Sequence, residues 1–223
     1  MQKKNVAIVN CLSKFRSGVE EILTGVDPNV EANISESLSE VDKQVKNAIN
    51  PLLSSIQDAV EAIVLTIHKE DFSADEAIGQ DALPEANKNA CSLYMKELQG
   101  FISRVAVDFL QDFLCQDFIS SCVLPLAEKI VHQFVLHASL VRPLGRSGQM
   151  RLASDCAQLE LALEPLVKDK LSAIGDAYSQ LRAFRSLLFM QPEDFASCPG
   201  LGKTLRVSTA LHLLFSKAPP ELR

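Results

Sequence analysis

The sequence contains no tryptophan and is poor in the other residues on which β-rich folds rely. Among 223 residues there are 2 Tyr and 9 Gly, and aromatic residues make up only 6% of the chain, whereas hydrophobic residues make up 47%. A β-sandwich would need more glycine turns and more Thr, Tyr and Trp. The chain is long and apolar enough to bury a sizeable core, in one large domain or two small ones. The composition therefore favours a helical protein.

Other absences exclude whole classes of function. The net charge is −6, and 22 basic residues are scattered among 28 acidic ones without a basic block. A nucleic-acid-binding protein would usually carry a positive stripe to neutralise phosphates. The 6 cysteines include no C-x-x-C pair, which favours buried thiols in a reducing compartment over a disulfide framework. The first residues lack the apolar region of a signal peptide, and no uninterrupted run of 18 apolar residues predicts a membrane span.

Apolar residues recur every three or four positions along most of the chain, which is the spacing of one face of an α-helix. Asp27-Pro28 reads as an N-cap followed by proline in the first turn. Asn50-Pro51 predicts either a second helix start or a kink in one long helix. The expected apolar face of the first helix consists of Val6, Val9, Leu12, Phe15, Val19 and Ile22.

The pattern divides the chain into three parts. Residues 1–67 form N-terminal amphipathic helices, residues 68–90 lose the periodicity and carry 6 acidic residues, and residues 91–223 form a C-terminal helical bundle. We expect residues 68–90 to be a mobile surface loop. No period-two pattern lasts more than a few residues, so no strand is predicted. The predicted fold class is all-α, an elongated helical bundle or continuous helical rod.

Within the C-terminal part, a helix is expected from about Ala90 to about Asp117, with a break at SSCVLP, residues 120–125. A further helix should end near Val141. The expected apolar stripe after it consists of Leu152, Cys156, Leu159, Leu163 and Leu166. The last helix should carry its apolar face on Leu205, Ala210, Leu211, Leu214 and Phe215.

The stretch SCPGLGKT, residues 197–204, ends like a phosphate-binding P-loop. That motif needs G-x-x-x-x-G-K-[ST], because its glycines let backbone N–H groups wrap the phosphates. Here Ser197 replaces the first glycine, Pro199 removes one N–H group, and no buried strand precedes the loop. A nucleotide-binding protein that uses residues 197–204 is the alternative hypothesis, and an ordinary loop before a helix is the interpretation that we favour.

No other constellation predicts catalysis. The stretch GRSGQ, residues 145–149, lacks the last glycine of the G-x-S-x-G elbow. The 4 histidines include no H-E-x-x-H motif, and His132 and His137 lie on different helix faces. The carboxylates Asp71 and Asp75 fall in the expected loop, where no rigid pocket would tune their pKa values. We predict neither an enzyme nor a metal or cofactor site.

The stretch HASLVRPLGRSGQMRLASD, residues 137–155, links two helical patterns. Arg142 precedes a proline, which disfavours helical backbone and ends the first helix. We expect Gly145 and Gly148 to give backbone freedom for a chain reversal. Ser147 should cap the next helix, whose first-turn N–H groups then point outward.

Residues 142–151, which we call the arginine corner, place Arg142, Arg146 and Arg151 close together in sequence. An anion, an acidic residue of a partner or a phospholipid head group could dock there. The alternative, which we favour, is that the arginines bind nearby carbonyl groups and acids such as Asp155. The net charge of −6 argues against strong binding to an acidic membrane surface.

Longer segments of the chain resemble the fifth subunit of the conserved oligomeric Golgi complex. LHASLVRPLGRSGQMRLASDCAQLELAL and CSLYMKELQGFISRV look like segments of that family. VEAIVLTIHKEDFS and LRAFRSLLF are similar to its neighbouring segments, in the same order. The resemblance covers nearly all of the chain and is least clear over the first 45 residues or so. Family members are much longer, so the resemblance implies that this chain corresponds to their C-terminal part.

The resemblance implies a non-enzymatic role in a peripheral complex on the cytosolic face of Golgi membranes. Members of the family are helical rods that act in vesicle tethering and retrograde transport within the Golgi. The implied partners are the other subunits, especially the seventh, together with SNAREs, Rab GTPases and coiled-coil tethers that contact the complex. The family brings no catalytic residues to carry over, which agrees with the motif search.

Overall fold

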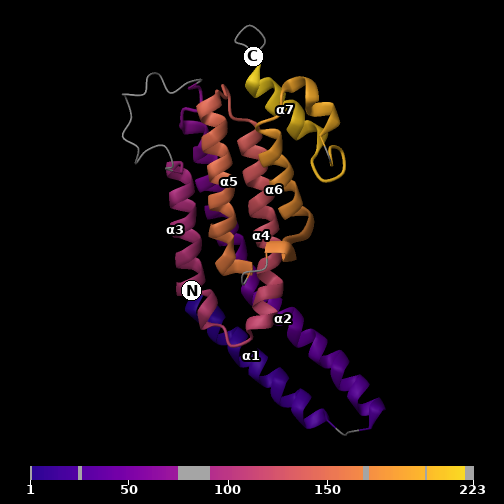
Figure 1. Ribbon diagram of the computed structural model, residues 1–223. Coiled ribbons are helices and arrows are strands. Elements are labelled where there is room, and N and C mark those ends of the chain that lie inside the picture. Colours follow the sequence, from indigo (N-terminus) through magenta and orange to yellow (C-terminus); the bar gives the residue numbers. More distant parts are fainter. Residues whose placement is uncertain (1, 25–26, 75–90, 168–170, 199, 219–223) are drawn as a thin grey trace.

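The computed structural model describes residues 2–24, 27–74, 91–167, 171–198 and 200–218, and these are almost entirely helical (Figure 1). The all-α prediction is confirmed, since the described residues contain no strand beyond an isolated bridge between Leu201 and Leu205. The α-helices are α1 (Gln2–Leu23), α2 (Pro28–Leu65), α3 (Leu93–Asp108), α4 (Gln116–Ser139), α5 (Arg146–Val167), α6 (Gly175–Leu187) and α7 (Val207–Lys217). Short 3-10 helices are η1 (Thr66–Lys69), η3 (Leu110–Asp112), η4 (Leu171–Ile174) and η5 (Pro192–Ser197).

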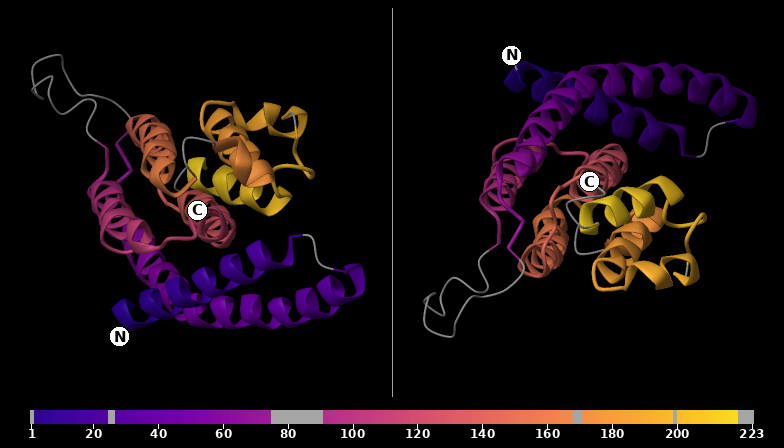
Figure 2. Two further views of the ribbon diagram at one scale, coloured as in Figure 1. Left: turned by 90° about the horizontal axis from the view of Figure 1, so that it is seen from below. Right: turned by 90° about the horizontal axis from the view of Figure 1, so that it is seen from above.

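Helices α1 and α2 form an antiparallel hairpin that projects from the rest of the molecule (Figures 1 and 2). The predicted cap at Asp27 is present, because its carboxylate accepts a hydrogen bond of 2.8 Å from the N–H of Asn29. Pro51 lies inside α2, so this segment is one long helix, and Figure 2 shows that α2 changes direction along its length. A proline in a helix removes one backbone donor, which is a common cause of such bending.

The predicted apolar face of α1 is only partly buried. Val6 and Val9 belong to the core, but Phe15 and Ile22 are 58% and 76% exposed. Their exposure corrects the expectation that the whole stripe forms one buried face. Because the hairpin projects, α2 and the connection into α4 are the described segments beside this half of α1, and they leave its outer side uncovered.

The break predicted at residues 120–125 is wrong. The chain instead leaves the helical state between Asp108 and Gln116, and α4 then runs through Pro125 without interruption. Pro125 is exposed and lies in the third turn of α4, where it costs one backbone hydrogen bond without ending the helix.

Helix α4 is the central element of the bundle, since it packs against α2, α5, α6 and α7. By length and composition alone it would also qualify as a membrane span, the one such helix in the described part of the chain, contrary to the prediction that no segment does. Glu128 and Lys129 interrupt its apolar run, which is why a search for an uninterrupted run misses it. Residues such as Ile130, Val131 and Phe134 are fully buried among the neighbouring helices, and this packing accounts for the apolar composition.

Helix α5 confirms the predicted stripe, because Leu152, Cys156, Leu159, Leu163 and Leu166 are all buried. The predicted face of α7 is partly wrong. Leu205 and Ala210 are buried as expected, whereas Leu211 and Phe215 are exposed, because α7 turns Thr209, Leu213 and Ser216 toward the core instead.

The predicted mobile loop, residues 68–90, is described only up to residue 74, and residues 75–90 lie outside the described part. The described portion is not a free loop. Residues 66–69 form η1, and Phe72 is 2% exposed. The acidic residues nearby made this segment look solvated, but Phe72 anchors it in the core.

Candidate interaction site

The arginine corner is joined to residues 70–74, which we call the 70–74 segment. The N–H of Gly145 donates to the carbonyl of Phe72 at 2.9 Å, and the N–H of Ser147 donates to the carbonyl of Ala74 at 3.0 Å. Helix α5 begins at Arg146, so Ser147 lies inside its first turn and is not the predicted cap. The N–H groups of Gly145 and Ser147, at the start of α5, are therefore occupied by backbone carbonyl groups and are not open to an anion.

The two glycines of the arginine corner allow another segment to approach the backbone closely. They do not serve a chain reversal. Neither Gly145 nor Gly148 has the positive φ that favours glycine. A side chain at Gly148 would collide with the carbonyl oxygen of Phe72, and one at Gly145 would collide with the carbonyl oxygens of Ser73 and Ala74. The expected role of these glycines is thus corrected: they let the 70–74 segment lie directly on the start of α5.

Arg151 fixes the same segment through its side chain. Its guanidinium donates to the carbonyl of Asp71 at 2.9 Å, lies 3.3 Å from a carboxylate oxygen of Glu70 and stacks 4.0 Å from the ring centre of Phe72. The other carboxylate oxygen of Glu70 accepts a hydrogen bond of 3.1 Å from the N–H of Tyr94 at the start of α3. Arg151 therefore binds local carbonyl and acidic groups, as the favoured interpretation expected.

The other two arginines have different surroundings. The Arg142 guanidinium lies 5.5 Å from the ring centre of Phe215 on α7. Arg146 is exposed, and no ion pair or ring contact of its side chain is found among the described residues. The sequence places the three arginines close together, but the structure gives each of them a separate environment.

Asp155 is buried, and its hydrogen-bond partners are Ser92 and Tyr94 instead of the arginines of the corner. Its carboxylate accepts hydrogen bonds from the Ser92 N–H at 2.9 Å, the Ser92 hydroxyl at 2.6 Å and the Tyr94 hydroxyl at 2.7 Å. Burial raises the pKa of Asp155, while the hydrogen bonds from Ser92 and Tyr94 oppose that rise. The cluster ties the start of α3 to the middle of α5, and it was missed because its members lie more than 60 residues apart in sequence.

A histidine pair lies beside the 70–74 segment. The Nε2 atom of His68 is 3.1 Å from the Nδ1 atom of His137 near the end of α4. Burial and the neighbouring His68 lower the pKa of His137. His132 is exposed on the same helix and lies away from this pair. No group of three or more His, Cys, Asp and Glu side chains in the described ranges could hold a metal ion.

The P-loop-like stretch folds into a closed turn. The carbonyl of Gly200 accepts hydrogen bonds from the N–H groups of Lys203, Thr204 and Leu205, and the N–H of Gly202 donates to Leu205. Gly200 and Gly202 have positive φ, which makes this tight turn possible. The backbone donors that a phosphate would need are therefore used within the turn, so the geometry does not support the nucleotide-binding alternative.

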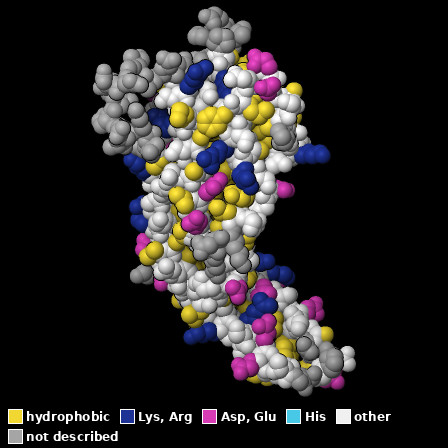
Figure 3. Space-filling model, viewed as in Figure 1, with side chains coloured by type: hydrophobic (Ala, Val, Ile, Leu, Met, Phe, Trp, Pro, Cys, Tyr) yellow, Lys and Arg dark blue, Asp and Glu magenta, His cyan; other side chains and the backbone are white. Residues whose placement is uncertain are grey.

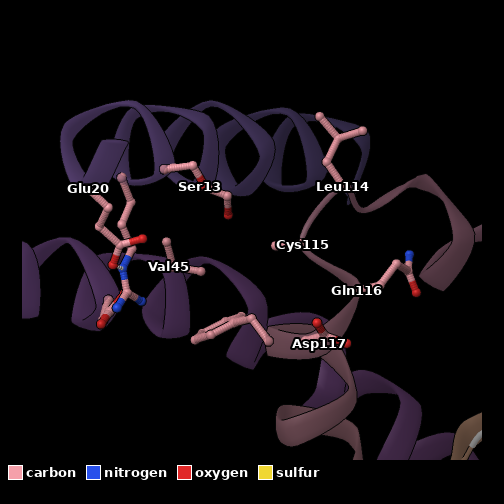
Figure 4. Close-up of a pocket in the computed structure, with 11 residues that line it drawn as sticks. Ser13, Glu20, Val45, Leu114, Cys115, Gln116 and Asp117 are labelled. Carbon is pink, nitrogen blue, oxygen red and sulfur yellow. Dashed lines mark hydrogen bonds and ion pairs between the residues drawn. The ribbon is translucent and has the colours of Figure 1, made fainter. Parts of the chain in front are cut away.

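The hairpin borders a cleft of about 460 Å³ where α1 and α2 meet the connection into α4 (Figure 4). Within it Arg16 forms ion pairs with Glu20 at 3.0 Å and with Asp42 at 2.5 Å. Ser13, Val45 and Cys115 also line the cleft. Because the charges of Arg16, Glu20 and Asp42 are paired with one another, the cleft offers no convergent set of free catalytic groups.

Comparison with known proteins gives four curated relatives, all named conserved oligomeric Golgi complex subunit 5. The mouse protein is 42% identical over 100% of this chain, and the Arabidopsis protein is 33% identical over 78% of it. The fruit-fly protein is 28% identical over 100% of the chain. The chain belongs to the conserved oligomeric Golgi complex subunit 5 family.

The resemblance seen in the sequence is thus confirmed for the subunit 5 family. The chain spans about a quarter of the length of these relatives, 26% of the mouse protein and 21% of the Arabidopsis protein. Its assignment to the C-terminal part of subunit 5 remains a prediction from the sequence. No family model and no solved structure matches the chain.

Proposed function

We propose that the chain acts as a non-enzymatic segment of a Golgi vesicle-tethering complex, through contacts between helices. The observation that carries this proposal is the 42% identity to mouse conserved oligomeric Golgi complex subunit 5 over the whole chain. We further propose a role in retrograde transport within the Golgi and a peripheral location on the cytosolic face of Golgi membranes. The partners that fit this role are other subunits, especially the seventh, with SNAREs, Rab GTPases and coiled-coil tethers contacting the complex.

The molecule supports an interaction role in two ways. Its polar clusters are used internally, because Asp155, Arg151 and the Gly200 turn make hydrogen bonds within the chain. Large apolar side chains are nevertheless exposed on several helices, among them Phe15, Ile22, Met150 and Leu211. Exposed apolar surface on a helical scaffold is typical of proteins that bind other helices.

Within the arginine corner, we propose Arg142 and Arg146 as contacts for acidic residues of a partner. Both side chains are exposed, whereas Arg151 already has Glu70, Asp71 and Phe72 as local partners. Exposed arginines at the rim of an interface contribute to association rate and specificity more than to total affinity.

Co-purification of the intact chain with the seventh subunit tests the proposal. We expect the two proteins to elute together, and the variant with Arg142→Glu and Arg146→Glu to associate more slowly, with a reduced dependence on salt. The double variant Lys96→Glu and Arg104→Glu, at exposed positions of α3, makes the same change in net charge and should leave the association unchanged. Separate elution of the wild-type chain and the seventh subunit at micromolar concentration would contradict the proposed role.

A further inference from the structure

A small pocket lies where α4 packs against both α6 and α7. Charge alone does not mark a ligand site on the face of the molecule drawn in Figure 3, where acidic, basic and hydrophobic side chains are mixed. The pocket is distinguished by hydrogen-bonding groups. Its volume is about 170 Å³, enough for a small side chain, since a single water molecule needs roughly 10–15 Å³. Its lining includes Gln133 and Leu136 of α4, Gln180 of α6, and Arg206, Ser208 and Thr209 at the start of α7.

Gln180 brings a buried amide to the wall of this pocket. The residue is 6% exposed, and its Oε1 atom accepts no hydrogen bond from any residue in the described ranges. Burial of a polar group without a hydrogen bond is unfavourable, and native proteins seldom leave such a group unpaired. The terminal torsion of a glutamine is broad, so the amide of Gln180 can turn toward a group that enters the pocket.

Gln133 contributes a second unpaired oxygen from the neighbouring helix. Its Nε2 group donates to a carboxylate oxygen of Glu61 on α2 at 3.0 Å. This bond fixes the orientation of the amide, because an ionised carboxylate only accepts hydrogen bonds. The Oε1 atom of Gln133 faces the other way, and it too has no donor within the described part of the chain. Two amide oxygens, on α4 and α6, therefore lack donors on residues that line one pocket.

The start of α7 has the opposite requirement. Arg206 stands at the N-cap position, and no side chain caps the helix. The N–H groups of Val207 and Ser208 have no acceptor among the described residues, as is usual for the first turn of an uncapped helix. Together with the guanidinium group of Arg206 and the hydroxyl group of Ser208, they make this end of the pocket a source of donors with partial positive charge.

We propose that the pocket binds a carboxamide group, the side chain of an Asn or Gln on a partner chain. The NH₂ group of this ligand donates to the oxygens of Gln133 and Gln180, and its carbonyl oxygen accepts from the start of α7 or from Arg206. A carboxylate would leave both glutamine oxygens without a donor. An ammonium group would meet the positive charge of Arg206 and of the helix terminus. A neutral carboxamide satisfies both ends of the pocket.

The rim of the pocket suits a side chain that enters from outside. Leu136 is 45% exposed and supplies an apolar wall for methylene groups, while Arg206 and Ser208 are exposed at the opposite side. Selective pockets commonly combine an apolar wall with a few polar groups that fix the orientation of the ligand. Because the carrier is a partner chain, this inference rests on the proposed interaction role, but the chemistry of the pocket can be tested on the isolated chain.

Nuclear magnetic resonance titration of the intact, ¹⁵N-labelled chain provides the test, with acetamide, acetate and methylammonium as probes of similar size. We expect acetamide to shift the side-chain NH₂ signals of Gln133 and Gln180 and the backbone N–H signal of Ser208. The shifts should saturate with a dissociation constant of roughly 10–100 mM, as a ligand of four heavy atoms allows. Acetate and methylammonium, at the same ionic strength, should cause no saturable shift of the Gln180 signal.

Two matched variants separate binding from stability. Gln180→Leu removes the amide at similar volume, so the saturable acetamide shifts should disappear while the melting temperature stays the same or rises. Gln99→Leu on α3 is the control, because Gln99 donates hydrogen bonds to the side chain and the carbonyl of Gln158. It should lower the melting temperature and leave acetamide binding unchanged.

Three results would overturn the proposal. The absence of a saturable acetamide shift would mean that the pocket holds only water. Equal binding of acetamide and acetate would show a site for anions in place of a site for carboxamides. Wild-type binding by Gln180→Leu would place the acetamide site elsewhere. The comparison of acetamide with acetate uses the wild-type chain, so it decides the question even if a variant does not fold. Failure to co-purify with the seventh subunit would contradict the proposed function and leave these titrations unaffected.

Discussion

The arginine corner and the α1–α2 hairpin are built from the same kind of amphipathic helix, but the chain covers them to different degrees. At the corner, the 70–74 segment occupies backbone N–H groups of Gly145 and Ser147, and Phe72 is 2% exposed. On the hairpin, Phe15 is 58% exposed, and no segment of the described chain lies over it. The sequence pattern of a helix does not say whether its apolar residues will be covered. Coverage depends on which distant segment packs there.

The largest expected difference comes from the two phenylalanines. Phe72→Ala should lower the free energy of unfolding by about 3–5 kcal/mol, because it removes a buried ring and the surface on which Arg151 stacks. Phe15→Ala should change the free energy of unfolding of the monomer by less than about 0.5 kcal/mol. Urea denaturation at low protein concentration measures both values. Similar losses for the two variants would contradict the contrast between the regions.

The two regions also differ in their tolerance of a methyl group. Gly148→Ala should destabilise the protein by about 1–3 kcal/mol, because the new Cβ collides with the carbonyl of Phe72 and the backbone must shift. Gly18→Ala on α1 meets open space and should stabilise the helix by about 0.5–1 kcal/mol. Thermal denaturation of the two variants should therefore move the melting temperature in opposite directions. A melting temperature for Gly148→Ala at or above the wild-type value would show that the 70–74 segment does not lie on α5.

Arg151 should matter more to stability than its neighbour Arg146. Arg151→Gln removes the ion pair with Glu70, the hydrogen bond to the carbonyl of Asp71 and the stacking on Phe72, and should cost about 1–2 kcal/mol. Arg146→Gln is a matched control at an exposed position and should cost less than about 0.5 kcal/mol. Chemical denaturation of both variants decides the order. Equal costs would mean that the contacts of Arg151 contribute little.

The smallest expected effect is the loss of stability that His137 causes at acidic pH. Burial and His68 hold the pKa of His137 below its ordinary value, while Glu61 acts in the opposite direction. The unfolded state therefore binds a proton first as the pH falls below about 6.5, and the stability present above that pH is lost as the pH falls through the folded-state pKa. His137→Gln should reduce this loss, and His132→Gln, at an exposed position of α4, should not. Unfolding curves at pH values from about 7 to 5 provide the measurement.

The sequence predicted the local features of the fold well. The cap at Asp27 and the buried stripe of α5 follow from residues close together in the chain, and both are present. The break at residues 120–125 was wrong because Pro125 is tolerated inside α4, where packing on four neighbouring helices outweighs one lost hydrogen bond.

The candidate site could be predicted only in outline. Its arginines and glycines are visible in the sequence, but their roles depend on a segment about 75 residues earlier in the chain. The contacts of Arg151 with Glu70 and of Asp155 with Ser92 could not be predicted from the sequence. They join residues far apart in the chain that tertiary packing brings together, so no motif spacing marks them. The best clue in the sequence to the contact between the 70–74 segment and α5 was Phe72, because an aromatic residue in an otherwise acidic stretch suggests a buried anchor.

Amide hydrogen exchange at Gly145 and Ser147 tests most directly the claim that the arginine corner is closed by contact within the chain. The N–H groups of both residues are bonded to the 70–74 segment and should exchange as slowly as amides in the core of α5. Amides near the tip of the hairpin, such as that of Leu23, should exchange faster. If Gly145 and Ser147 instead exchange as fast as the hairpin tip, and become protected only when phosphate is added, the corner is an open anion site and the claim of closure is wrong.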